Sequence, residues 1–161
     1  MSANVRAIPE GYHSISPALT CKDAARAIEF YKQAFGATEM NRMDGPGGSV
    51  AHAELRIGNS VIFVSDEFPG MSAAPTPTTT PSSYLFLYTE DVDGTMNRAL
   101  AAGATVSMPV MDMFWGDRYG KVTDPFGHSW GIATHVEDVA PEEITRRAAE
   151  WTANMAKAAG A

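Results

Sequence analysis

The sequence predicts an α+β fold made of two βαβββ modules, whose curved mixed sheets surround a shared cleft. The main observation is an internal repeat: helical segments at 23–35 and, about 67 residues later, at 91–102 both run into the sequence Gly-Ala-Thr. In each copy a strand-like run precedes the helix, and a glycine turn precedes a later apolar strand. A supersecondary unit that recurs at a fixed spacing determines the architecture, so we expect the functional site in the cleft between the two copies.

The first module is expected at residues 11–68. Its first strand, predicted at 13–19, contains Pro17, which indicates an edge position or a bulge. Asp23 can cap the helix over 23–35 through its carboxylate, and the apolar residues of this helix recur at helical spacing. Three further strands are predicted at 38–43, 49–57 and 60–66.

A linker, a second module and a helical tail account for the rest of the chain. Residues 69–83 are rich in Pro, Thr and Ser without apolar periodicity, which predicts an exposed, flexible linker. The second module is expected at 84–139, and the tail at 140–161 should be helical from Pro141, because proline suits the first helical position. The strands of the second module are predicted at 84–89, 105–111, 118–123 and 128–135. An apolar stripe on the tail needs a surface on this chain or on a partner subunit; it consists of Ile144, Ala148, Trp151 and Met155.

Composition and charge exclude several classes of function. The 161 residues suffice for one well-buried core, and 12 basic against 19 acidic residues give a net charge of −7. Nucleic-acid binding needs a basic surface, so this charge argues against it and permits a neutral or cationic ligand. No apolar run reaches membrane-spanning length, and residues 1–11 lack a signal-peptide pattern. The single cysteine, Cys21, excludes an internal disulfide and fits a reducing compartment, so a cytoplasmic location is expected.

Three stretches of the sequence resemble a known superfamily. AARAIEFYKQAFGA (24–37), AHAELRIGNSVIFVSDE (51–67) and FWGDRYGKVTDPFGHSWGIATHVEDV (114–139) are similar to the vicinal oxygen chelate superfamily, and within it to the PhnB-like branch. Its members include glyoxalase I, bleomycin-resistance and fosfomycin-resistance proteins, and extradiol dioxygenases. The resemblance implies the glyoxalase/bleomycin resistance/dioxygenase fold over 1–161, a small-molecule ligand and a homodimer. It leaves the substrate open, because this fold hosts many chemistries.

The resemblance also implies where a metal would bind. Metal-dependent members take one His, Gln or Glu ligand from the first and last strand of each module. The matching positions here fall near Ser16, Phe63, Tyr84 and Gly131, and none of these is a usual ligand. A catalytic divalent metal needs about three protein ligands. We therefore expect no metal at the shared site and no cofactor, which argues against a glyoxalase I-type mechanism.

His52 and Glu54 are the candidate catalytic residues. Strand alternation places the apolar residues of 49–57 under the helices and these two side chains toward the cleft, with Cβ atoms about 7 Å apart. They could form a general base with an orienting carboxylate, or half of a relocated metal site. The alternative is a polar strand face in which Arg56 neutralises Glu54. The remaining histidines lie at strand ends and turns without metal-binding spacing; these are His13, His128 and His135.

An aromatic ligand pocket is expected in the cleft. The alternation rule leaves Tyr84, Phe86 and Tyr88 facing the cleft, and a gap at Gly131. A glycine-flanked pair at 114–115 could clamp a planar ligand or could cover the core. The residues expected to bind the ligand are Ser16, Phe63, Tyr84, Phe86, Phe114 and Trp115.

Two hypotheses for function follow from these residues. The favoured one is a metal-independent protein that sequesters an antibiotic-like or aromatic small molecule, as bleomycin-resistance proteins do. The alternative is a glyoxalase-like lyase, an isomerase or a dioxygenase-type enzyme that uses His52 and Glu54 or a relocated metal. Cys21 is interpreted as a packed residue rather than a nucleophile, because no histidine lies close to it in the sequence.

Overall fold

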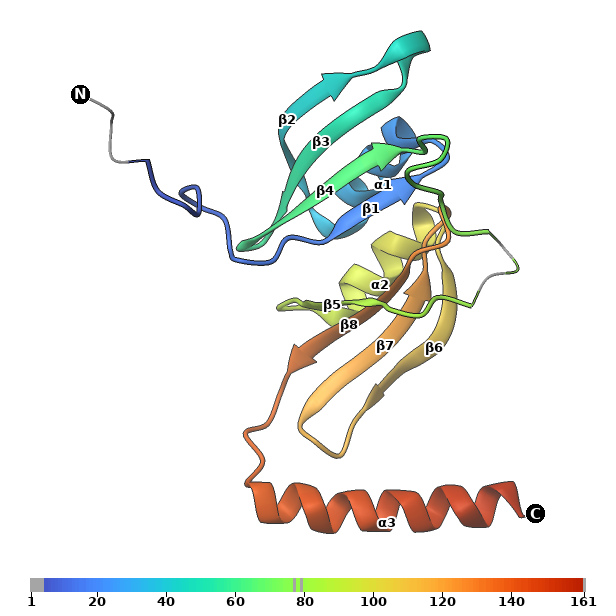
Figure 1. Cartoon of the computed structure of the whole chain (residues 1–161). Coiled ribbons are helices and arrows are strands. Elements are labelled where there is room, and N and C mark those ends of the chain that lie inside the picture. The colour runs from blue at the N-terminus through green and yellow to red at the C-terminus, as the bar shows by residue number, and fades with distance from the viewer. Residues whose placement is uncertain (1–4, 77, 79, 161) are drawn as a thin grey trace.

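Two four-stranded sheets, each made from one half of the chain, form the body of the molecule (Figure 1). The computed structural model describes residues 5–76, 78 and 80–160. The sheets have the strand orders β1-β4-β3-β2 and β5-β8-β7-β6, so the predicted pair of βαβββ modules is confirmed. The elements are β1 (Ala18–Cys21), α1 (Ala24–Phe35), β2 (Thr38–Asp44), a short 3-10 helix η1 (Pro46–Gly48), β3 (Val50–Ile57), β4 (Ser60–Asp66), β5 (Leu85–Tyr88), α2 (Val92–Ala101), β6 (Thr105–Asp112), β7 (Asp117–Thr123), β8 (Ser129–His135) and α3 (Pro141–Ala159). Parts of the expected lead-in, linker and tail, at 1–4, 77, 79 and 161, lie outside the described residues.

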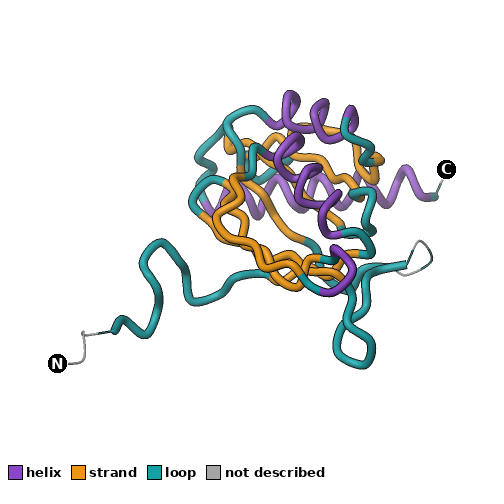
Figure 2. The backbone as a smooth tube through the Cα atoms, turned by 90° about the horizontal axis from the view of Figure 1, so that it is seen from above, coloured by secondary structure: helices purple, strands orange, loops and turns teal. Residues whose placement is uncertain are grey.

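The two sheets share one layer of helices and one core. Within each sheet the first strand pairs in parallel with the last strand of its module, and the other pairs are antiparallel. The helices α1 and α2 lie on the same side of the strands and pack against each other (Figure 2). Apolar side chains from both modules form a single buried cluster beneath them; its large members include Ile28, Tyr31, Leu55, Val64, Trp130 and Ile132.

The first strand begins later than the sequence predicts. We expected it at 13–19, whereas β1 starts at Ala18 and ends at Cys21. Before β1, the carbonyl oxygen of Pro17 accepts a hydrogen bond from the backbone N–H of Phe63 at 2.8 Å. Proline has no N–H to give to a ladder, so regular pairing starts only after it.

The repeat extends to the bonds that hold each helix start. Asp23 and Asp91 cap α1 and α2, each accepting a hydrogen bond from a backbone N–H three residues on. The backbone N–H of the first residue of α1 also donates to Asp66 at 2.8 Å. In the second module the equivalent N–H of α2 donates to the hydroxyl of Thr134 at 2.9 Å. In both modules the first N–H of the helix therefore donates to a side chain near the end of the last strand, but the side chain is a carboxylate in one module and a hydroxyl in the other. A comparison of residue types alone would miss this equivalence.

A buried carboxylate joins the two modules. Asp124 is 4% exposed, and its Oδ2 accepts hydrogen bonds from the Tyr31 hydroxyl at 2.8 Å and from Trp130 Nε1 at 3.0 Å. Its Oδ1 accepts from the backbone N–H groups of Phe126 and His128, both at 2.9 Å. Burial, together with the negative charge of Asp124, raises the pKa of Tyr31 well above its ordinary value, so the tyrosine stays a donor. One side chain therefore fixes a turn, a core tryptophan and the opposite module.

Cys21 is a packed residue, as predicted. The fold does bring a histidine near it, since His128 Nε2 lies 3.8 Å from the Cys21 sulfur. That nitrogen, however, donates to the carbonyl oxygen of Thr20 at 2.9 Å. Burial raises the pKa of the Cys21 thiol to about 12, so it is protonated and a poor nucleophile.

Most described residues of the linker are exposed, as predicted, but one part of it packs against the body. Ala74 is buried, and its backbone N–H donates to the Glu67 carboxylate at 2.8 Å. The neighbouring Pro75 lies so close to Gly127 that a β-carbon on this glycine would come within 2.8 Å of the proline ring. Small apolar residues in a Pro-rich stretch can thus anchor it to a turn, which periodicity does not reveal.

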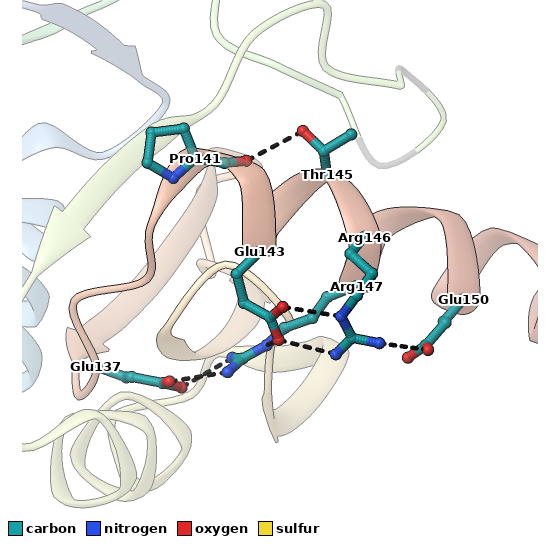
Figure 3. A network of polar contacts seen from close by, with 7 residues as sticks. All are labelled: Glu137, Pro141, Glu143, Thr145, Arg146, Arg147 and Glu150. Atoms are coloured by element: carbon teal, nitrogen blue, oxygen red, sulfur yellow. Dashed lines mark hydrogen bonds and ion pairs between the residues drawn. The ribbon is translucent and has the colours of Figure 1, made fainter.

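The helix α3 leaves the body and buries none of its residues. Figure 3 shows the ion pairs at the start of α3: Arg147 forms a bidentate ion pair with Glu137 at 2.9 Å and also bonds to Glu143. Farther along, the ring of Trp151 lies 5.8 Å from that of Phe114. The predicted helix is confirmed, but its apolar stripe stays largely in solvent. Among the described residues, no helix has the length and apolar character needed to cross a membrane.

Candidate functional site

The outer face of the first sheet carries the candidate catalytic residues. Strand alternation in β3 is as predicted from His52 onward, because Ala53, Leu55 and Ile57 are buried while His52 and Glu54 are half-exposed. At the start of the strand Val50 is buried in place of Ala51, which was expected under the helices, and the pairing with β2 is irregular there. His52 Nε2 lies 3.3 Å from Glu54 Oε1. The structure therefore brings this pair together.

The expected neutralisation of Glu54 by Arg56 is not what the structure shows. Arg56 instead donates to the carbonyl oxygen of Gly11 at 3.3 Å. The partner of Glu54 is Tyr12, whose hydroxyl donates to Glu54 Oε2. This hydrogen bond, followed by that from His52, holds the pKa of Glu54 below its ordinary value and raises the pKa of Tyr12. Glu54 is thus an ionised carboxylate that can orient His52. Tyr12 was missed because it lies just before the predicted first strand, outside any periodic segment.

A small cavity adjoins this pair. It has a volume of about 390 Å³, and among its lining residues are Tyr12, Glu54 and two residues predicted to bind ligand, Ser16 and Phe63. The ring of Phe63 also lies 5.1 Å from that of His52. The candidate residues of the first module therefore form one group, with His13 at its exposed edge.

The same face of the second sheet is aromatic. Tyr84, Phe86 and Tyr88 are 49%, 42% and 61% exposed, while Leu85 and Leu87 between them pack on the core, as the alternation rule predicts. Phe86 stacks on Tyr119, with ring centroids 5.4 Å apart and planes 5° apart. We call the surface formed by Tyr84, Phe86, Tyr88, Trp115 and Tyr119 the aromatic face. Tyr119 is absent from the sequence prediction, because nothing along the chain connects it with β5.

The expected gap at Gly131 is filled by two of these rings. A β-carbon at Gly131 would lie 2.9 Å from Tyr119 Cε2 and 3.1 Å from Tyr84 Cε2. Burial, followed by the neighbouring Tyr84 hydroxyl, raises the pKa of Tyr119 to about 12, so Tyr119 is a neutral phenol. A ligating side chain at this position would displace both rings. The residues present therefore do not fit the metal site that the superfamily implies, and within the described ranges no three His, Cys, Asp or Glu side chains gather as metal ligands.

Asp117 holds one edge of the aromatic face. This buried carboxylate accepts hydrogen bonds from Trp115 Nε1 at 2.9 Å, from the Tyr88 hydroxyl at 3.0 Å and from His135 Nδ1 at 2.7 Å. Burial alone would raise the pKa of Asp117, but the bonds from His135, Trp115 and Tyr88 hold it below its ordinary value. His135 also bonds through Nε2 to Asp138 at 3.0 Å. Its bonds to Asp138 and Asp117 raise the pKa of His135, which favours the charged imidazolium that can donate to both carboxylates.

Phe114 and Trp115 have separate roles. Trp115 joins the aromatic face, because its ring lies 6.0 Å from that of Tyr119. Phe114 packs edge-on against Trp115 and faces Trp151 of α3. This position agrees with a cover over the end of the β6–β7 hairpin, and a ligand contact for Phe114 remains a prediction.

A groove of about 720 Å³ runs between the two modules. One wall is formed by β5 with its aromatic residues, and the other by residues around β1 and the β3–β4 turn. The two groups of candidate residues, around Glu54 and on the aromatic face, are not joined directly: among the described residues, no hydrogen bond, ion pair or ring contact links them.

The fold and sequence identify the class of protein. A family model described as the Glyoxalase/Bleomycin resistance protein/Dioxygenase superfamily matches residues 13–132. The chain is also 44% identical over 135 residues to the uncharacterized protein Rv0887c of Mycobacterium tuberculosis (strain H37Rv), a match that covers 81% of this chain and 79% of that protein. The chain therefore belongs to the glyoxalase/bleomycin resistance protein/dioxygenase superfamily, which confirms the resemblance found in its sequence.

Solved structures agree with this assignment. The Arabidopsis thaliana gene product At5g48480 is 32% identical with a TM-score of 0.60, over 76% of this chain and 98% of that one. A PhnB protein from Bacillus cereus is 20% identical with a TM-score of 0.57, over 76% of this chain and 99% of that one. The second likeness concerns the fold alone.

Proposed function

We propose that the protein binds a small aromatic molecule on the aromatic face without a metal ion. The observation that carries this proposal is the exposure of Tyr84, just before β5, together with Phe86 and Tyr88 on that strand. Large aromatic side chains clustered on a surface cost free energy in water, and such patches mark binding sites. A groove between the modules lies beside them, which gives the ligand a concave place to lie.

The face is organised before a ligand arrives. Phe86 is fixed by stacking on Tyr119, and Tyr88 and Trp115 are fixed by hydrogen bonds to Asp117. Rigid rings lose little conformational entropy on binding, so this arrangement favours affinity. The face remains open on one side, whereas small-molecule sites usually bury most of their ligand. Our proposal therefore includes a homodimer, in which a second copy of the chain covers the open side of the bound molecule. We also propose that this dimer is cytoplasmic.

A neutral naphthalene dye tests the proposal. We expect phenylnaphthylamine to bind with a rise in its fluorescence, and Phe86→Ala to weaken binding about tenfold, because stacked aromatic contact is lost. Phe68→Ala is the matched control, since Phe68 is a partly exposed phenylalanine away from the aromatic face. Absence of binding to the unaltered protein, or equal binding by the Phe86 and Phe68 variants, would show that the aromatic face is not the site.

A second candidate function is a glyoxalase-like lyase, an isomerase or a dioxygenase-type enzyme that uses His52. The observation favouring it is the ionised Glu54 carboxylate 3.3 Å from His52 Nε2. A carboxylate in this position orients an imidazole for proton transfer.

Elemental analysis tests whether the protein holds a relocated metal ion, which the enzymatic alternative allows and our proposal excludes. For protein purified without chelator we expect no stoichiometric transition metal. If about one equivalent per chain were bound, and were lost in His52→Ala but kept in His13→Ala, the enzymatic alternative would replace our proposal.

A further inference from the structure

Lys121 places a positive charge against Tyr84 of the aromatic face. It lies on β7 two residues after Tyr119, and its neighbours across the sheet are Met108 on β6 and Gly131 on β8. Its ammonium nitrogen lies 4.2 Å from the centre of the Tyr84 ring. The side chain is half-buried, so its charge is partly withdrawn from water.

No acidic partner of this ammonium is found within the described ranges, unlike most other half-buried Lys and Arg side chains. Carboxylates pair at 2.7 Å with three of these, which are Lys32, Arg118 and Arg147. Arg56 uses a carbonyl oxygen instead. For Lys121, the contact found among the described residues is with the face of the Tyr84 ring. An ammonium group carries three N–H donors. The face of a ring does not accept hydrogen bonds from them in the way that carboxylate oxygens do. The donors are therefore free to bind an incoming anion.

The register places this charge beside the stacking surface. Phe86 on β5, Gly131 on β8 and Lys121 on β7 are paired in one row across three adjacent strands. Strands in a sheet lie about 4.8 Å apart, so the Cα atoms of Phe86 and Lys121 are about 10 Å apart. The residue between them is glycine, and the rings of Tyr84 and Tyr119 lie over it as a continuation of the stacking surface. A bicyclic ring resting on Phe86 would thus bring a substituent to the Lys121 ammonium.

We propose that the aromatic face is selective for planar aromatic anions, whose carboxylate, sulfonate or phosphate group pairs with Lys121. The inference rests on the proposed function, because it assigns a ligand class to the same face. The net charge of −7 alone would favour cations. Exposed charges farther away than about 8–10 Å are largely screened at physiological salt, however. The charges on the face itself therefore decide. Asp117 is buried and paired with His135, whereas no carboxylate among the described residues pairs with Lys121.

Two dyes that differ by one charged group test the selectivity. Anilinonaphthalene sulfonate carries a sulfonate, and phenylnaphthylamine is the same ring system without it. We expect Lys121→Met to weaken binding of the sulfonate dye about tenfold, and to leave the neutral dye unchanged, because only the sulfonate loses a partner. Lys121→Arg keeps the charge and should retain tight sulfonate binding. Lys157→Met is the control: it changes the net charge equally, but lies in the last turn of α3.

The outcomes separate this inference from the proposed function. If both dyes bind and Lys121→Met weakens them equally, or weakens neither, the selectivity for anions is wrong while the aromatic site stands. If Lys157→Met weakens the sulfonate dye as much as Lys121→Met does, the effect is one of overall charge, and the inference also fails. If neither dye binds the unaltered protein, or if Phe86→Ala leaves both unaffected, the proposed function fails together with the inference.

Discussion

Replacing Asp124 with alanine is expected to lower the free energy of unfolding by about 3–5 kcal/mol, the largest effect of any change discussed here. The substitution removes the acceptor for the Tyr31 hydroxyl and Trp130 Nε1, both of which are buried. A buried donor without an acceptor costs about 1–3 kcal/mol. The turn that holds Phe126 and His128 also loses its side-chain bonds.

Urea unfolding at neutral pH, followed by tryptophan fluorescence and by circular dichroism, measures this loss. Asp44→Ala is the matched control, because Asp44 is a largely exposed carboxylate paired with Arg42. An exposed pair of this kind is worth at most about 1 kcal/mol. Tyr31→Phe should give an intermediate loss, since it removes one donor and leaves the other three in place. A loss below about 1 kcal/mol for Asp124→Ala would contradict its role as the joint between the modules.

Replacing Asp117 with asparagine is expected to destabilise the protein in a pH-dependent way. The one oxygen of asparagine can accept from Trp115 Nε1 and the Tyr88 hydroxyl, but its amide N–H groups then face His135 Nδ1. Only the neutral imidazole can accept that bond. The substitution should therefore lower the pKa of His135, and should cost about 1–3 kcal/mol of stability where His135 is charged.

The direction of the pH effect follows from the two pKa shifts. The pKa of His135 is raised in the folded protein, so its contribution is fully present below about pH 6.5 and is lost as pH rises through the folded pKa. The pKa of Asp117 is lowered, so its contribution is present above about pH 3.9 and is lost as pH falls through the folded pKa. The difference between the unaltered protein and Asp117→Asn should therefore be largest between about pH 4 and pH 6.5.

Histidine NMR titration and urea unfolding at several pH values test this expectation together. Asp138→Asn provides the control, because Asp138 bonds the other nitrogen of His135 but neither Trp115 nor Tyr88. It should lower the pKa of His135 with little loss of stability, as Asp138 is fully exposed. A destabilisation by Asp117→Asn that stays constant from about pH 4 to pH 9 would show that the bond to His135 does not matter.

The sequence was sufficient to predict the fold because the relevant signals are local and occur twice. Each signal acts over a few residues: the helix caps at Asp23 and Asp91, the glycine turns and the alternating strands. Because the same signals occur in both copies of the repeat, the prediction for one module supports the prediction for the other. Errors arose where a contact from elsewhere decides the outcome. Pro17 delayed the first strand, and the packing of Ala74 anchored part of a linker that was expected to be exposed.

The candidate site could be predicted only in part. Alternation within a strand correctly grouped His52 with Glu54, and Tyr84 with Phe86 and Tyr88. Alternation could not identify residues that lie on the same face but belong to another strand, because their positions depend on the register between strands. The residues missed for this reason are Asp117, Tyr119 and Lys121. Each is an ordinary polar or aromatic residue in the sequence and acquires its role through its neighbours across the sheet.

Every strand ladder among the described residues closes within one half of the chain. The first half can therefore complete its sheet during synthesis, as soon as β4 has emerged and before β5 exists. Until the second half is made, the side of α1 that will meet α2 and the Tyr31 hydroxyl stay open to water. In the last step of folding the two folded halves associate. Because a short connection joins them, each half is present at a high effective concentration relative to the other.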